Sequence, residues 1–187
     1  MKVIGNPISF DNVIDPSLGP NNPSTAADSA IIGSAVWSNT GNVFSSNDVY
    51  ATVTPGTGSH YLVATNFGFS IPAGATINGI TAQVERSGAS IKDSSVKLTK
   101  TGSTVVGTDL LNATTWESTD RISTYGSSSN LWGTAWNSTE INSANFGLAF
   151  AAQRVSASPT ASVDHIKITV AYTPDTTPPT FTAARTA

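Results

Sequence analysis

Apolar and polar residues alternate with a period of two along several short segments of this chain. In residues 80–85, ITAQVE, every second side chain is apolar, and the alternation recurs in residues 49–53, 96–99 and 165–172. Such alternation is typical of a β-strand with one buried and one solvated face. The full pattern predicts strands in residues 34–37, 48–54, 60–71, 76–88, 94–100, 104–111, 146–155 and 161–173.

The residues that interrupt these segments are typical of turns and bulges. Pro72 has no amide for a strand ladder, and Gly74 tolerates the backbone angles of a tight turn, so we expect a corner there. Gly68 and Gly79 each interrupt an apolar pattern and predict bulges. About eight short strands with almost no helix predict an all-β fold, a single jelly-roll-like β-sandwich of antiparallel strands.

One long segment, residues 112–145, is rich in Ser, Thr and Asn and is expected to be a loop. Within it, the sequence NSTEINSAN favours one turn of helix, because Ser138 or Thr139 can cap it and Ile141 can face inward.

Both ends of the chain are predicted to be extended arms. Residues 1–30 contain four prolines, which argue against a helix or a central strand. Residues 174–187 are rich in Pro and Thr, a composition typical of extended chain. The sandwich is therefore expected to span residues 31–173. The apolar residues expected to anchor the arms on a neighbouring subunit are Val3, Ile4 and Phe181.

Composition excludes several classes of protein. Charged residues make up 11 % of the 187 residues, against roughly 25 % in an average soluble protein, and the net charge is −3. Because Lys and Arg are not clustered, nucleic-acid binding is not expected. No apolar run approaches the roughly 20 residues of a membrane helix, and no secretory signal is recognised, so membrane insertion is not expected. The lack of cysteine excludes disulfides and thiolate chemistry.

The sequence offers little support for a metal ion or cofactor. His60 and His165 are its two histidines, and neither has a metal-ligand spacing. His165 follows Asp164 in an expected strand, which fits either a histidine–carboxylate pair or a residue on the polar strand face. No calcium loop with D-x-D-x-D-G spacing is present, so a structural calcium would require the fold to gather separate acids. The acids considered for such a site are Asp11, Asp15 and Asp28, or Glu117 and Asp120.

The sequence is predicted not to encode an enzyme. It contains no G-x-S-x-G, no phosphate-binding P-loop and no G-x-G-x-x-G between a strand and a helix. Its 12 acids allow many pairs, but a glycosidase would need two of them about 5–10 Å apart, which spacing along the chain does not establish.

Aromatic residues in the long loop allow two interpretations. Trp116, Tyr125, Trp132 and Trp136 could form an exposed platform that stacks on sugar rings. Alternatively, the three tryptophans could close the open ends of the sandwich or lie between subunits.

Several segments resemble, in order, a module of tailed-phage structural proteins that also has similar forms in bacterial surface proteins. They are VYATVT, YLVATNFGFSIPAGATINGI, TTWESTD, WNSTEINSANFGLAF and ASVDHIKITVAY, within residues 37–172. The resemblance implies a capsid decoration, fibre or tail-associated subunit that assembles as an oligomer, and it implies no catalytic residues. The final segment, PDTTPPTFTAARTA, resembles a bacterial-surface linker that leads to an immunoglobulin-like domain.

Two functions are therefore expected for this chain. The first is a non-enzymatic assembly protein of a virion, with copies of itself and other virion or surface proteins as partners. The alternative is a carbohydrate-binding or adhesive module at the bacterial surface or outside the cell, with cell-surface glycans as ligands.

Overall fold

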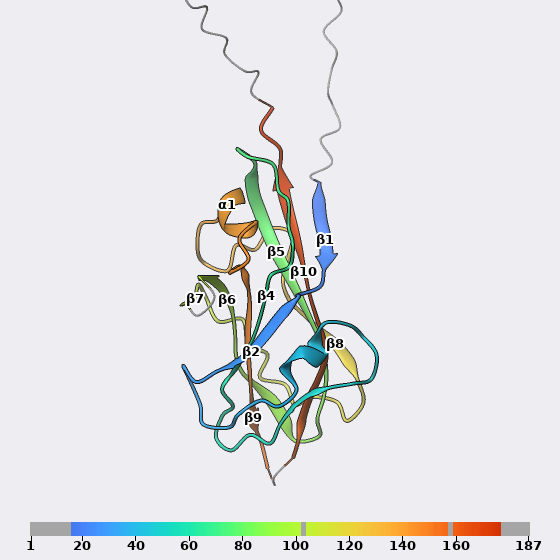
Figure 1. Ribbon diagram of the computed structural model, residues 1–187. Helices are drawn as coiled ribbons and strands as arrows, with labels where there is room; N and C mark the ends of the chain where they lie inside the picture. The colour runs from blue at the N-terminus through green and yellow to red at the C-terminus, as the bar shows by residue number, and fades with distance from the viewer. Residues whose placement is uncertain (1–15, 102–103, 157–158, 177–187) are drawn as a thin grey trace, which may run out of the picture.

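The computed structural model describes residues 16–101, 104–156 and 159–176. These residues form two antiparallel β-sheets that pack face to face (Figure 1). The elements in chain order are β1 (Ser17–Asn21), β2 (Thr25–Ser29), the 3-10 helix η1 (Thr40–Val43), β3 (Ala51–Val53), β4 (Tyr61–Thr65), β5 (Thr76–Ser87), β6 (Ile91–Thr101), β7 (Thr104–Val106), β8 (Arg121–Gly126), α1 (Ser138–Ile141), β9 (Gly147–Arg154) and β10 (Ala161–Thr173).

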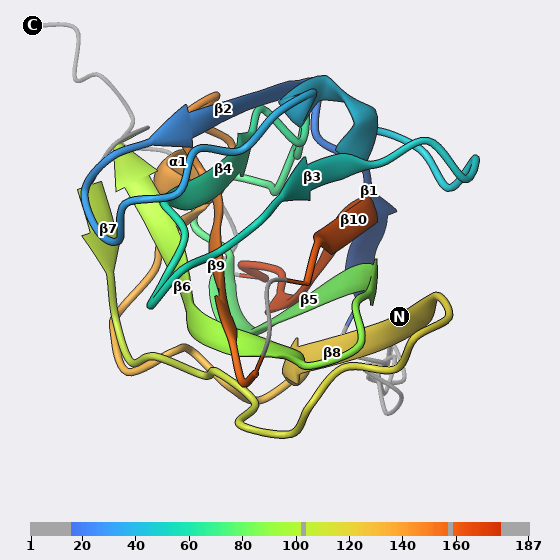
Figure 2. The same cartoon turned by 90° about the horizontal axis from the view of Figure 1, so that it is seen from below.

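The strand order is that of a jelly roll. The first sheet has the order β1-β10-β5-β8, and β3 also pairs with β10. The second sheet has the order β2-β4-β9-β6-β7. From β3 onward, the strands β3-β10-β5-β8 face the strands β4-β9-β6-β7, as the two Greek keys of a jelly roll require. Seen from below, the two sheets form layers on either side of the core (Figure 2). The predicted all-β, jelly-roll-like sandwich is confirmed.

Two strands lie where an arm was expected. The described part of the N-terminal segment, residues 16–30, contains β1 and β2, which pair with β10 and β4. Both occupy sheet edges, where Pro20 in β1 can lack an amide without breaking an interior ladder. Proline thus excluded a central strand but not an edge strand. The described part of the chain has ten strands instead of about eight, because β1, β2 and β8 were not predicted and the predicted strand in residues 34–37 forms only an isolated bridge.

The core follows the alternation seen in the sequence. On β5, Ile80, Ala82 and Val84 are fully buried between the sheets, whereas Thr81 and Gln83 are half-buried on the outer face. On the central strand β9, residues 147–152 are all buried, because strands and loops cover both of its faces.

The helical turn and one bulge also agree with prediction. Helix α1 covers the predicted turn and buries Ile141, but Asn137 is its cap in place of Ser138 or Thr139. Near Gly79, the pairing of β5 with β10 skips one residue, which confirms a bulge there.

Two other predictions, one for Gly68 and one for the long loop, are wrong. Strand β4 ends at Thr65, so Gly68, with φ near +66°, lies in the irregular segment that follows and not in a bulge. Strand β8 forms inside the segment that was expected to be a loop. It was not predicted because apolar and polar residues do not alternate clearly in its sequence, RISTYG.

A further bulge changes the face assignment of β10. Val163 pairs with Arg86 and His165 pairs with Glu85, so Asp164 is an extra residue in the ladder. Val163 and Asp164 are both buried. Strict alternation would place Val163 and His165 on one face, but the bulge resets it, so that Val163 is buried and His165 faces outward.

The two described ends of the chain lie side by side. Ser17 pairs with Ala171, and the Tyr172 N–H donates to the Pro16 carbonyl at 3.0 Å. Strand β10 ends at Thr173, where the sandwich was predicted to end.

The expected arm anchors Val3, Ile4 and Phe181 lie outside the described residues. Among the residues that are described, no helix has the length and apolarity needed to cross a membrane.

Candidate functional site: the outer face of the first sheet

Polar side chains line up across three neighbouring strands on the outer face of the first sheet. Gln83 on β5 pairs with Lys167 on β10, and Glu85 pairs with His165. On the other side of β5, Glu85 pairs with Ile122 on β8. Directly opposed residues of antiparallel strands point to the same face, so these side chains form one continuous surface.

This surface contains a shallow hollow that is open to solvent and encloses no space of its own. It is lined by Gln83, Glu85, Ile122, His165 and Lys167. Small-molecule pockets generally enclose most of their ligand, whereas this hollow encloses none, so it suits only a ligand that lies flat on the sheet.

The hollow combines hydrogen-bonding groups of different kinds. Burial, and then the charge of Lys167, lower the pKa of His165, while Glu85 and Asp164 partly oppose the shift. The imidazole is therefore neutral at neutral pH, and it lies 2.9 Å from Asn22 Oδ1, to which Nε2–H can donate. Lys167 and Glu85 add one charge of each sign.

His165 and Asp164 do not form a pair. The Asp164 carboxylate is buried and accepts the Asn47 N–H at 3.1 and 3.3 Å, whereas His165 faces outward. Of the two interpretations of His165, the polar strand face is the correct one.

The expected aromatic platform is absent from the surface. Trp116, Tyr125, Trp132 and Trp136 are 4 %, 3 %, 0 % and 8 % exposed, so none of them offers a ring face to a sugar. All four belong to the apolar core. The glycan-stacking assignment is therefore wrong, and the tryptophans fill the sandwich, as the alternative interpretation held.

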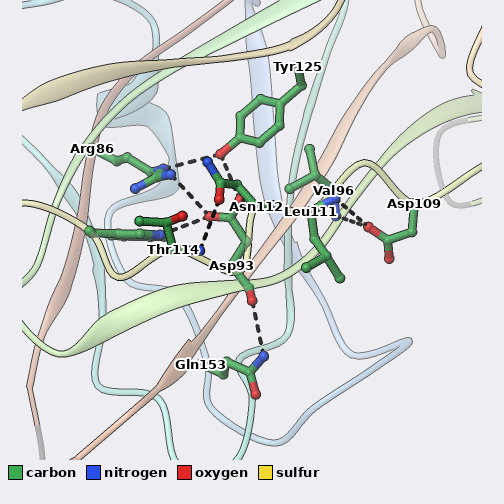
Figure 3. A network of polar contacts seen from close by, with 10 residues as sticks. Arg86, Asp93, Val96, Asp109, Leu111, Asn112, Thr114, Tyr125 and Gln153 are labelled. Atoms are coloured by element: carbon green, nitrogen blue, oxygen red, sulfur yellow. Dashed lines mark hydrogen bonds and ion pairs between the residues drawn. The ribbon is translucent and has the colours of Figure 1, made fainter.

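Two of these aromatic residues serve a buried polar network (Figure 3). Arg86, Asn112 and Tyr125 converge on the fully buried carboxylate of Asp93. Tyr125 Oη donates to Asp93 Oδ2 at 2.9 Å, and the Trp116 indole N–H donates to Oδ1 at 2.8 Å. Burial raises the pKa of Asp93, and Arg86 opposes that shift most strongly.

The other two tryptophans close gaps around the sheets. The Trp132 indole N–H donates to the Ile80 carbonyl at 2.9 Å, and the Trp136 indole N–H donates to the Leu131 carbonyl at 3.0 Å. Lys100 lies over the Trp136 ring, with Nζ 4.7 Å from the ring centre. The buried indole N–H groups are thus satisfied internally, as expected of structural tryptophans.

The acids considered for calcium lie in different surroundings. Asp120 lies in one group of carboxylates with Asp48 and Asp164, and this group does not include the exposed Glu117. Asp11 and Asp15 lie outside the described residues. Asp28 instead accepts hydrogen bonds from the Trp37 N–H at 2.8 Å and contacts His60 Nδ1 at 2.7 Å.

Comparison with known proteins assigns no family to this chain. No protein-family model and no curated protein matches the sequence. A solved structure named "BiXyn10A CBM1 APO", a carbohydrate-binding module, is similar with 10 % sequence identity and a TM-score of 0.38. The match covers 80 % of this chain and 99 % of that chain.

Proposed function

We propose that this chain is a non-catalytic β-sandwich module that binds a carbohydrate on the outer face of its first sheet. The observation that supports this is the hollow over β5, β8 and β10, which gathers an amide, a carboxylate, an imidazole and an ammonium group. Sugar hydroxyls both donate and accept hydrogen bonds, and this set of side chains offers them both kinds of partner.

Ile122 supplies the apolar part of the surface. Its side chain lies among the polar groups and the residue is 52 % exposed, so the C–H face of a sugar ring can pack on it. Because the hollow is shallow and lacks an aromatic ring, binding is expected to be weak, with a Kd on the order of 0.1–1 mM for a short oligosaccharide. Such a module is expected at a bacterial or virion surface.

A binding function fits this surface better than hydrolysis. Retaining and inverting glycosidases generally need two carboxyl groups around the scissile bond. The hollow has one, from Glu85. No nucleophile and base pair is formed there, so the surface supports recognition without bond cleavage.

The binding proposal is tested by a glycan array followed by calorimetric titration of the best oligosaccharide. Gln83→Ala and Lys167→Ala are each expected to weaken binding about 5- to 10-fold, because each removes a hydrogen bond worth about 1–1.5 kcal/mol. Lys97→Ala is the matched control, since Lys97 is also half-buried at mid-strand but lies on β6 of the second sheet. An array without any bound glycan, or equal affinities in all variants, would contradict the proposal.

Assembly into an oligomer is a second candidate function. The observation that favours it is the junction of the two described ends, where Pro16 and Tyr172 are hydrogen-bonded. Both terminal segments therefore begin at one place on the fold, from which they can reach the same neighbouring subunit or a virion partner.

Light scattering after size-exclusion chromatography tests this assembly. The full chain is expected to be an oligomer, and deletion of residues 177–187 is expected to raise the concentration needed for assembly while leaving the fold intact. A monomeric full chain, or unchanged assembly after the deletion, would contradict this second function.

A further inference from the structure

Three carboxylates from distant parts of the chain meet beside β10. They belong to Asp48, Asp120 and Asp164, and one oxygen of each lies within 4.8 Å of the other two. Asp48 lies in the loop between η1 and β3, Asp120 immediately precedes β8, and Asp164 is the bulged residue of β10. The sequence separation hides this group, because only the fold brings the three segments together.

Backbone irregularities position two of these acids. The bulge in β10 turns Asp164 inward, where its carboxylate accepts the Asn47 N–H. Asp48 has φ near +60°, a left-handed conformation that Asp adopts more readily than most residues. The loop and the bulge thus hold carboxylates toward one another, where like charges repel.

The described residues do not supply a hydrogen-bond donor to every oxygen of these three carboxylates. Asp120 Oδ2 accepts the Tyr50 hydroxyl at 2.7 Å, but Asp120 Oδ1 is shielded from solvent and has no hydrogen-bond partner. Asp164 is only 1 % exposed. Within the described residues, the ion pairs involve Asp28, Asp93 and Glu140 and none of these three acids.

A buried carboxylate oxygen that accepts no hydrogen bond lowers the stability of the fold. Three neighbouring carboxylates that no cation neutralises lower it further. A bound cation would supply both the missing partner of Asp120 Oδ1 and the missing charge.

We propose that Asp48, Asp120 and Asp164 bind a calcium ion. The available ligands are oxygens, which Ca²⁺ prefers, and no His is part of the group. Calcium takes ligands at about 2.3–2.6 Å, so two ligands on opposite sides are about 5 Å apart, and oxygens within 4.8 Å can share one ion. Magnesium requires about 2.0–2.1 Å and a strict octahedron, so it is expected to bind more weakly.

The ion would add to the hydrogen bonds from Asn47 to Asp164 and from Tyr50 to Asp120, which already link these three parts of the sandwich. It would tie the loop that carries Asp48 to β10 and to the start of β8, one strand of the glycan-binding face. This inference does not depend on the proposed function, because a structural ion would stabilise the fold whatever that face binds.

Calorimetry and thermal unfolding of the full chain, after removal of divalent ions with a chelator, test the site with CaCl₂ as the probe. One ion per chain is expected to bind, and calcium at 100 times Kd is expected to raise Tm by about 5–10 °C. Asp120→Asn and Asp48→Asn are each expected to weaken calcium binding at least 10-fold. Asp48 is exposed, so Asp48→Asn is expected to fold even if replacement of a buried acid is not tolerated.

Glu117→Gln is the matched control, because Glu117 is an exposed acid three residues before Asp120 and lies outside the group. It is expected to bind calcium like the wild type. A wild-type chain with no heat of binding and no Tm shift would overturn the proposal. So would Asp48→Asn and Asp120→Asn variants that bind as tightly as Glu117→Gln.

Discussion

Replacement of Asp93 by alanine is expected to lower the free energy of unfolding by about 3–5 kcal/mol. The Asp93 carboxylate accepts from the Asn112 N–H, the Trp116 indole and the Tyr125 hydroxyl, and Arg86 Nη2 lies 3.5 Å from Oδ1. Truncation leaves these donors without an acceptor and the buried guanidinium without its counter-charge, although Arg86 Nε–H still donates to Tyr125 Oη at 3.2 Å. A buried charge that has lost its partner lowers stability by more than the intact pair contributes to it.

Urea unfolding followed by tryptophan fluorescence measures this effect. Glu117→Ala is the control, since it removes the same charge from an exposed position and should change stability by about 0.5 kcal/mol or less. A loss below about 1 kcal/mol for Asp93→Ala would mean that water or other groups satisfy the network.

A double-mutant cycle separates the network from simple truncation. Tyr125→Phe alone removes one donor and is expected to cost about 1 kcal/mol. In the Asp93→Ala background, the hydroxyl has lost its acceptor but still accepts the Arg86 Nε–H at 3.2 Å, so the cost of the same change should differ from its cost in the wild type. Equal costs in both backgrounds would show that the hydroxyl and the carboxylate act independently.

The sequence predicted those strands whose two faces differ in environment. The alternation in β5 and β10 is clear because one face of each packs in the core and the other meets solvent. Strand β8 was not predicted because it lies at the sheet edge, where residues on both of its faces are exposed and its two faces therefore differ little. The prolines of residues 16–30 likewise argued against strands there, although an edge strand tolerates a residue without an amide N–H and an interior strand does not.

The candidate sites were harder to predict than the strands. Asp164 reaches its partners only because a bulge interrupts β10, and no residue type marks that bulge in the sequence. The hollow depends on the register that places His165 opposite Glu85, which is set by pairing between segments far apart in the chain. Local patterns report burial, whereas these sites depend on long-range register.

The tryptophans also show that the local sequence does not reveal which side chains are buried. Their density in a polar segment suggested a surface platform, yet each of the three indole N–H groups finds an acceptor inside the fold. Asp93, for example, lies on β6 and accepts from Trp116, which is 23 residues away. A buried indole needs one acceptor, and sequence alone does not reveal where it comes from.

Replacement of Phe146 by alanine is expected to cost about 3–5 kcal/mol of stability. Phe146 is fully buried immediately before β9, and its ring centre lies 5.3 Å from that of Trp136 and 5.8 Å from that of Phe69. Phe67, at 6.4 Å, completes this aromatic cluster at the end of the sandwich where β4 stops and β9 begins. Removal of the central ring leaves a cavity that three other rings cannot fill together without leaving their own contacts.

Chemical denaturation measures this loss, and Ile122→Ala serves as its control. Ile122 is 52 % exposed, so its truncation should cost less than about 1 kcal/mol while weakening glycan binding at the hollow. Phe146→Ala should show the reverse, with lowered stability and unchanged affinity once folded, because it lies in the core and not on the outer face. A Phe146→Ala variant as stable as Ile122→Ala would mean that the aromatic cluster collapses around the vacancy, and that this end of the sandwich is held by its backbone pairing instead.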